Sequence, residues 1–188
     1  MSIRKDMRVE PTSAAANVIV VVGVSGSGKS TVGLLLATRL GVPFVDGDDV
    51  HPAANIAKMA AGYPLDDADR RPWLAALAGH ARSMARNGGG VIACSALKRA
   101  YRDELAAAAP SVWFLHLALD RETALERVSH RAEHFMPARL VDSQFALLEP
   151  LEPDERGVTV DAAAGVNALI VQAIAWSETL PGYPVTPK

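Results

Sequence analysis

The sequence has few of the features that mark secreted, membrane-spanning or nucleic-acid-binding proteins. It contains a single cysteine, Cys94, which excludes a disulfide framework and favours a reducing compartment. No apolar run approaches the roughly 20 residues that a membrane-spanning helix needs, and residues 1–17 lack the apolar centre of a signal peptide. The net charge of −2 does not suggest a binding surface for nucleic acid or membranes. We therefore expect a cytoplasmic protein without nucleic-acid or membrane partners.

The composition that remains is that of an ordinary globular protein. Hydrophobic residues make up 49% of the 188-residue chain and charged residues make up 21%, as is usual for soluble domains. This length suits one domain with its own core, which we place at residues 18–178. We interpret residues 1–17 as a flexible N-terminal extension and residues 179–188, which hold three prolines, as a loose tail.

The strongest signal is a glycine-rich loop at residues 23–30. Its residues, Gly-Val-Ser-Gly-Ser-Gly-Lys-Ser, fit Gly-x-x-x-x-Gly-Lys-[Ser/Thr], the phosphate-binding loop of nucleotide triphosphatases and small-molecule kinases. A β-branched run at 18–22 precedes it and a helical pattern follows at 29–40, which is the context that the motif requires. A glycine-rich turn without a ligand is the alternative interpretation.

The loop predicts how ATP and Mg²⁺ would be bound. Glycines let successive backbone N–H groups turn toward phosphate oxygens, and the N-terminal end of the helix adds partial positive charge. Lys29 is expected to reach the β- and γ-phosphates, and the Ser30 hydroxyl is expected to bind Mg²⁺. The predicted nucleotide contacts from this segment are Gly23, Ser25, Gly26, Ser27, Gly28, Lys29, Ser30 and Thr31.

Strands alternate with helices along the rest of the chain, which predicts a parallel sheet with helices on both faces. We expect strands at 18–22, 44–45, 91–94, 112–117 and 158–160, and helices at 29–40, from 52, at 70–86 and 98–109, from 120 to about 130, and at 138–148 and 166–176. A helical substrate cap is expected at about 50–72. The segment 131–137 fits no regular pattern, so we predict a mobile lid at about 127–137.

Acidic residues follow the second predicted strand. Ligands of α/β sheets bind at the carboxyl ends of the strands, so Asp46 is a candidate Mg²⁺ ligand and Asp48 a candidate base for a substrate hydroxyl. A solvated acidic turn is the alternative, and the preceding phosphate loop favours the catalytic interpretation. His51 and Asn55 come next and are candidates for contacts to substrate hydroxyls, or else for capping and surface roles.

Basic side chains later in the chain are candidates for binding anions. Arg70 could clamp a substrate carboxylate with its planar guanidinium group. Lys98 and Arg102 are four residues apart on the next predicted helix and could bind an anionic substrate together. Arg127 and Arg131 share a helical face in the predicted lid, where they could stabilise transition-state charge while lid closure excludes water. For Arg70 a solvated helix start is the alternative, and for each pair it is a solvated or ion-paired helix face.

Several further segments carry a resemblance to a known family. They are Asp-Gly-Asp-Asp-Val-His-Pro (46–52), Asn-Ile-Ala-Lys-Met (55–59), the run from Gly to Leu at 62–74, Cys-Ser-Ala-Leu-Lys (94–98), Tyr-Arg-Asp (101–103), His-Phe-Met-Pro (134–137) and Ser-Gln-Phe (143–145). Together with the phosphate loop, they resemble the thermoresistant-type gluconokinases, relatives of shikimate kinase and the nucleoside monophosphate kinases. The resemblance runs from about residue 18 to 176.

The resemblance implies ATP-dependent phosphorylation of D-gluconate at its 6-hydroxyl, giving 6-phosphogluconate and ADP. It also implies a three-layer P-loop kinase fold, with a five-stranded parallel sheet in the order 2-3-1-4-5, and often a homodimer. The implied roles are Mg²⁺ binding by Ser30 and Asp46, orientation of the 6-hydroxyl by Asp48 as base, substrate contacts from Arg70 and Lys98, and lid and nucleotide contacts from Arg127 and Arg131.

Three other functions stay open at this point. A kinase of another small acceptor, such as shikimate, a nucleoside monophosphate or another sugar acid, would share everything before Asp49, although the segments 49–51 and 94–98 argue against it. A non-catalytic nucleotide-binding switch would be expected to show base-reading motifs such as Asn-Lys-x-Asp, which the sequence lacks. A catalytically inactive relative is disfavoured because the phosphate-loop and acidic residues are all present.

Overall fold

The computed structural model describes residues 16–130 and 138–181, and the structural statements below concern these residues. The strands are β1 (Val18–Val22), β2 (Phe44–Asp46), β3 (Gly90–Cys94), β4 (Val112–Ala118) and β5 (Gly157–Asp161). The helices are α1 (Lys29–Leu40), α2 (Ala53–Ala60), α3 (Asp67–Arg86), α4 (Arg99–Ala108), α5 (Arg121–Ser129), α6 (Ala138–Leu147) and α7 (Val166–Ser177), with 3₁₀ turns η1 (Gly47–Val50) and η2 (Ala162–Ala164).

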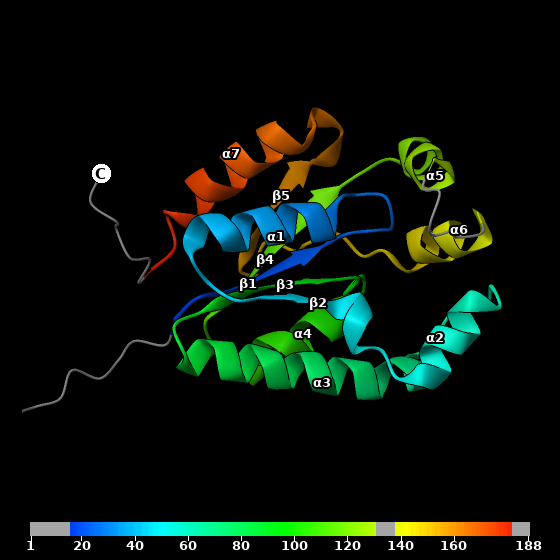
Figure 1. The fold of residues 1–188 in the computed structure, drawn as a ribbon, viewed down its shortest axis with the longest axis horizontal. Coiled ribbons are helices and arrows are strands. Elements are labelled where there is room, and N and C mark those ends of the chain that lie inside the picture. Colours follow the sequence, from blue (N-terminus) through cyan, green and yellow to red (C-terminus); the bar gives the residue numbers. More distant parts are fainter. Residues whose placement is uncertain (1–15, 131–137, 182–188) are drawn as a thin grey trace, which may run out of the picture.

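The strands form one parallel sheet in the order β2-β3-β1-β4-β5, between two layers of helices. Helices α1 and α7 cover one face, and α3 and α4 cover the other (Figure 1). The strand order expected from the resemblance is therefore confirmed, as is the three-layer α/β class. Within the described part of the chain, no helix is both long enough and apolar enough to cross a membrane.

The position of β1 at the centre of the sheet explains why its sequence is β-branched and apolar throughout. All five of its residues are buried, because a strand in the middle of a covered parallel sheet faces helices on both sides. Val18, Val20 and Val22 pack in the cluster that includes α3 and α4 residues. Ile19 and Val21 point the other way and pack in the cluster that includes α1 and α7 residues.

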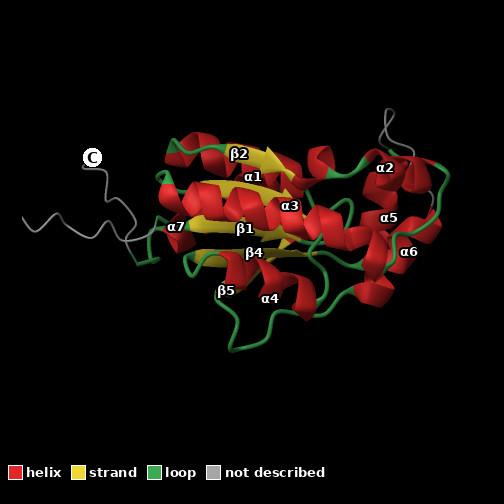
Figure 2. Cartoon of the chain, turned by 90° about the horizontal axis from the view of Figure 1, so that it is seen from below, coloured by secondary structure: helices red, strands yellow, loops and turns green. Residues whose placement is uncertain are grey.

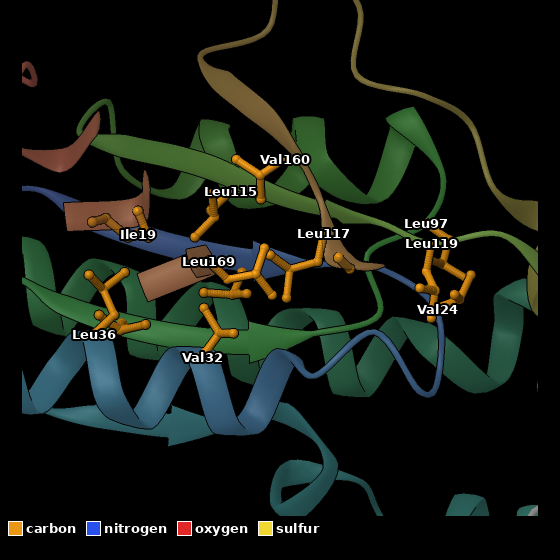
Figure 3. Packing of buried hydrophobic residues seen from close by; sticks show 14 of the residues in the cluster. Ile19, Val24, Val32, Leu36, Leu97, Leu115, Leu117, Leu119, Val160 and Leu169 are labelled. Carbon is orange, nitrogen blue, oxygen red and sulfur yellow. The ribbon is translucent and has the colours of Figure 1, made fainter. Parts of the chain in front are cut away.

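The close-up of the second cluster shows how the α1 and α7 layer is attached to the sheet. Ile19 from β1 and Leu115 from β4 lie against Leu36 of α1 and Leu169 of α7 (Figure 3). These four side chains are at most 2% exposed. Burying each one contributes about 1.5–3 kcal/mol, so this packing attaches the α1 and α7 layer firmly to the sheet.

The carboxyl ends of the strands share one edge, and this edge positions the site. The register pairs Val22 with Cys94 and Asp46 with Ala93. The loops that follow β1, β2 and β3 therefore begin side by side. Helices α2, α5 and α6 lie beyond this edge in both views (Figures 1 and 2).

Helix α3 begins three residues earlier than its predicted start at 70. Asp66 caps it, because its side-chain oxygen accepts a hydrogen bond from the Asp69 N–H at 2.9 Å. The Asp69 carboxylate accepts in return from the Asp66 N–H, also at 2.9 Å. This reciprocal capping box satisfies two N–H groups that would otherwise lack partners, and it fixes the start of the helix that carries Arg70.

Candidate phosphoryl-transfer site

The loop between β1 and α1 has the geometry of a phosphate cradle. Gly28 caps α1 with φ of +90° and Gly26 has φ of +85°, conformations that favour glycine. A Cβ atom on Gly23 would lie 2.8 Å from the Leu117 carbonyl oxygen, so this end of the loop packs tightly on β4. The N–H groups of the loop and the N-terminus of α1 together suit an anion. The predicted nucleotide-binding segment therefore fits a triphosphate.

Lys29 and Ser30 occupy the start of α1, next to this cradle. Lys29 Nζ donates to the Val24 carbonyl oxygen at 3.0 Å, so its side chain folds back over the loop. The side chains of Ser30 and Thr31 are exposed in the first helical turn. Hydroxyl and carboxylate oxygens are ligands that Mg²⁺ prefers, and Mg²⁺ in kinases commonly takes one or two protein ligands together with phosphate oxygens. Ser30 and Asp46 have the right chemistry for such a shared site.

The acidic turn after β2 is held from three directions. Asp46 caps η1, since its Oδ1 accepts from the Asp48 N–H at 3.1 Å. Gly47 packs so closely on β3 that a Cβ atom would lie 2.7 Å from the Ala93 carbonyl oxygen. The Trp73 Nε1–H also donates to the Gly47 carbonyl oxygen, at 2.7 Å. The turn is thus fixed, and it leaves the Asp48 side chain exposed at the sheet edge.

Cys94, at the end of β3, shows that the charged groups converge there. Burial raises the pKa of its thiol to about 12, and the charges of Lys29, Asp48 and Asp46 also act on it. The thiol therefore stays protonated and serves as a small buried side chain. The three charged residues therefore lie near the end of this strand, as expected from the positions of the phosphate loop and the acidic turn.

His51 and Asn55 are buried in the cap, where each has a partner. The His51 ring stacks on Trp73, with centroids 4.7 Å apart and an interplanar angle of 4°. Asn55 Nδ2 donates to the Asp69 carbonyl oxygen at 2.8 Å and lies 3.4 Å from His51 Nδ1. Burial lowers the pKa of His51, with Asp48 opposing and Arg70 adding to the shift, so the ring is neutral at pH 7. These contacts attach α2 to α3; contacts of the two residues with substrate hydroxyls stay a prediction.

Arg70 and Lys98, both predicted substrate contacts, come together around one aromatic ring. Arg70 Cζ lies 5.8 Å and Lys98 Nζ 5.5 Å from the centroid of the Tyr101 ring. Lys98 Nζ is also 2.8 Å from Asp67 Oδ1, which accepts a second hydrogen bond from the Tyr101 hydroxyl. Residues Arg70, Lys98, Tyr101 and Asp67 form what we call the basic cluster.

Arg70 is the most unusual member of the basic cluster. Its side chain is 7% exposed, and Nη2 donates to the Leu65 carbonyl oxygen at 3.1 Å. In the described part of the chain, its Nε is buried without a hydrogen-bond partner. A buried donor without a partner costs about 1–3 kcal/mol, so such a group marks a position where a ligand acceptor would be favourable.

Arg102 does not join the basic cluster, and the structure argues against its predicted role as a substrate contact. It is 2% exposed, and its Nη2 lies 2.8 Å from Glu155 Oε2. Its Nη1 donates to the carbonyl oxygens of Leu97 and Glu149, each at 3.0 Å. The spacing argument failed because the Arg102 guanidinium is buried against Glu155 and these carbonyl groups, whereas Lys98, the N-cap residue of α4, pairs with Asp67.

Arg127 lies on the nucleotide side of the site. Its Nη1 donates to the Gly26 carbonyl oxygen at 3.3 Å and its Nη2 to the Ala162 carbonyl oxygen at 3.0 Å. It therefore connects the phosphate loop to the turn after β5. Arg131 and most of the predicted lid at about 127–137 fall outside the described residues, so the roles of Arg131 and of the lid remain predictions.

Three contributors were not among the predicted site residues: Tyr101 and Asp67 in the basic cluster, and Trp73 behind the acidic turn. All three lie within segments that carried the family resemblance, which was the only sequence signal for them. The resulting edge has a phosphate cradle and two carboxylates on one side, and cations around an aromatic ring on the other. Such a site can hold a triphosphate and a small acidic acceptor with a hydroxyl group between them.

Comparisons with known proteins agree with this chemistry. A family model described as an AAA domain matches residues 18–151. The thermosensitive gluconokinase of Escherichia coli (strain K12) is 48% identical over 145 residues, which cover 77% of this chain and 78% of the relative.

Two solved structures are similar in fold and sequence. A sugar kinase from Janibacter sp. has a TM-score of 0.83 at 44% identity and covers 91% of this chain and 99% of its own. A gluconokinase from Sinorhizobium meliloti 1021 has a TM-score of 0.79, also at 44% identity. The match covers 86% of this chain and 91% of the gluconokinase chain. With its phosphate loop, acidic turn and basic cluster on one sheet edge, the chain belongs to the gluconokinase family of P-loop kinases.

Proposed function

We propose that the chain transfers the γ-phosphoryl group of ATP to the 6-hydroxyl of D-gluconate, giving 6-phosphogluconate and ADP. The observation that carries this proposal is the convergence of Arg70 and Lys98 on Tyr101, at the same sheet edge as the phosphate loop. Relatives that cover most of the chain and are named gluconokinase support gluconate as the acceptor.

The basic cluster would bind the carboxylate end of gluconate. The unpartnered Arg70 Nε can donate to a carboxylate oxygen, and an arginine–carboxylate contact of this kind is charge-assisted. Lys98 carries the second positive charge, and its hydrogen bond with Asp67 raises its pKa, so it is fully protonated at neutral pH. Binding at this end orients the acid so that its distant hydroxyl points away from the cluster.

The acidic turn and the phosphate loop would act at the other end. Asp48 would hold the 6-hydroxyl in line and take its proton as the bond from O6 to the γ-phosphorus forms and the bond to the ADP oxygen breaks. Lys29 would stabilise the charge on the transferred group. Mg²⁺, held by Ser30 and Asp46, would neutralise the phosphate oxygens. Asp48 and Arg70 both influence the pKa of His51, so both charges act near this buried ring of the cap.

The proposal also includes features that rest on the family resemblance and on the sequence. These are the choice of Mg²⁺ as the metal, the nucleotide contacts of Arg127 and Arg131, assembly as a homodimer, and a cytoplasmic location. Each has its own simple test, such as metal dependence of the rate or the molar mass in solution.

An acceptor panel tests the proposed function. ADP release is measured with gluconate, other aldonates, shikimate and AMP, with a Lys29→Met preparation as the control for contaminating kinases. We expect gluconate to give the highest kcat/KM, with no comparable release by the control protein. Release with shikimate, AMP or another aldonate but not with gluconate would assign a different acceptor. Nucleotide binding without release for any acceptor would favour a switch.

Trp73→Phe should lower kcat by about tenfold while the KM for gluconate changes little. Phenylalanine keeps a ring against His51, but it lacks the N–H that holds the Gly47 carbonyl oxygen at 2.7 Å. The turn that carries Asp48 then loses one of its three restraints, so the base spends less time in line. Steady-state kinetics with gluconate and ATP measures both constants.

Trp113→Phe is the matched control for this variant. Trp113 Nε1 donates to Asn17 Oδ1 at 3.1 Å, near the opposite ends of the strands. Each variant thus loses one indole hydrogen bond, and each is expected to lose some stability. A kcat that falls equally in both, or in neither, would show that Trp73 does not position the acidic turn.

A further inference from the structure

Gln144 of α6 reaches the phosphate loop from a distant part of the chain. Its Oε1 accepts a hydrogen bond from the backbone N–H of Ser25 at 2.6 Å, across 119 residues of sequence. Ser25 is the third residue of the Gly-x-x-x-x-Gly-Lys-Ser run, in which backbone N–H groups face phosphate oxygens. A side-chain amide therefore stands at the edge of the cradle, where the end of the triphosphate is expected.

The position of Gln144 is fixed by the packing of α6. Val141 is fully buried in the core, and Asp142 pairs with Arg121 at 2.7 Å. Beyond the helix, the Glu149 N–H donates to the Leu97 carbonyl oxygen at 2.9 Å. Arg102 in turn donates to the Glu149 carbonyl oxygen. The chain is thus held on either side of Gln144, and the hydrogen bond with Ser25 holds the Gln144 side chain itself.

The chemistry of a carboxamide suits this position. It offers an acceptor oxygen and two N–H donors on one planar group. With its oxygen engaged by Ser25, its NH₂ group lies on the other arm of the same planar amide and can donate to an anion beside the loop. A carboxylate could make the same bond to Ser25, and a stronger one, but it would bring a negative charge next to the phosphates. The sequence has the neutral amide.

We propose that Gln144 is a further residue of the nucleotide site, whose Oε1 holds the Ser25 N–H and whose Nε2 donates to the γ-phosphate of ATP. This inference rests on the proposed function only in taking ATP as the phosphoryl donor, and it does not depend on the acceptor. It gives α6 a part in recognising the triphosphate. The same helix leads, through Glu149, to the turn that presents Lys98, so the nucleotide and acceptor sides are joined by one segment.

Gln144→Glu separates this role from that of a structural link. The substitution keeps an acceptor oxygen for Ser25 but replaces both N–H donors with an anionic oxygen. Affinity is measured by calorimetry without gluconate, for ADP and for the non-hydrolysable analogue AMP-PNP, which differ in the γ-phosphate. We expect AMP-PNP binding to weaken by about tenfold or more relative to ADP binding, and the KM for ATP to rise while the KM for gluconate does not.

Ala146→Glu is the control for charge, because Ala146 is an exposed residue of the same helix. It should leave the ratio of the two nucleotide affinities unchanged. The proposal would be overturned if Gln144→Glu kept the parental ratio of AMP-PNP affinity to ADP affinity. This holds whether both affinities are unchanged or both are weakened equally. Because nucleotide binding is measured alone, a wrong acceptor assignment would leave this result intact.

Discussion

Lys29→Met is expected to lower kcat by about 10²–10³-fold and to leave gluconate binding nearly unchanged. Lys29 is folded over the loop that precedes it, with Nζ 3.0 Å from the Val24 carbonyl oxygen. Its charge acts at the end of β3, as do those of Asp48 and Asp46. Methionine keeps much of the length of the lysine side chain but lacks the positive ammonium group that Lys29 would place beside the phosphates. Because this charge matters most as the phosphoryl group transfers, the loss should appear in kcat.

Arg39→Met is the matched control, since Arg39 lies exposed in the last turn of the same helix. The substitution removes one positive charge at the opposite end of α1, and the variant protein should keep the parental kcat and KM values. Calorimetry with gluconate and thermal unfolding accompany the kinetics of both proteins. Near-normal turnover in Lys29→Met, with contamination excluded, would contradict the role that we give to the phosphate loop.

Arg102→Met is expected to destabilise the fold by roughly 3–5 kcal/mol. Arg102 and Glu155 are 2% and 4% exposed, and the guanidinium also donates to the carbonyl oxygens of Leu97, Glu149 and Pro150. The substitution leaves a buried carboxylate without its partner and several carbonyl groups without a donor. For a chain of this size the corresponding fall in Tm is on the order of 10 °C.

Arg99→Met is the control, because Arg99 precedes Arg102 by three residues and makes exposed ion pairs with Asp103 and Asp154. Exposed pairs contribute little to stability, so its Tm should change much less. If Arg102 instead contacts substrate, Arg102→Met would raise the KM for gluconate at an unchanged Tm. That pattern would restore the interpretation made from sequence spacing.

The Arg102 contact also predicts the direction of a pH effect on stability. Burial works to raise the pKa of Glu155. The hydrogen bonds from Arg102 and the Glu152 N–H, together with the charges of Arg102 and Arg99, outweigh it and hold the pKa below its ordinary value of 4.5. The stabilisation is therefore present above pH 4.5 and is lost as the pH falls through the lowered pKa. The difference in unfolding free energy between the parent and Arg102→Met should shrink over the same range.

The parts of the fold that the sequence predicted are those encoded locally. The β-branched run of β1 and the glycine loop determine strand, turn and helix start within a few residues, and these elements are found as expected. The acidic turn was also predicted locally, because Asp46 and Asp48 come at the end of the second predicted strand. The strand order is not a local property, and it was predicted only through the family resemblance.

The parts that local patterns could not give depend on contacts between distant residues. Arg102 is turned away from the site by Glu155, 53 residues further on, and no spacing within α4 reveals that pair. Gln144 reaches Ser25 across 119 residues. The early start of α3 is different, because the carboxylates of Asp66 and Asp69 were a readable capping signal that the prediction did not use.

The most direct test of the proposed activity is to identify the product that the protein makes from gluconate. The protein is incubated with ATP, Mg²⁺ and gluconate, and the product is examined by ¹H–³¹P correlation NMR. The proposal predicts one phosphate ester, on carbon 6 of gluconate, formed in equal amount with ADP. Orthophosphate alone, or an ester at another carbon, would contradict the account of how Asp48, the phosphate loop and the basic cluster hold the acceptor.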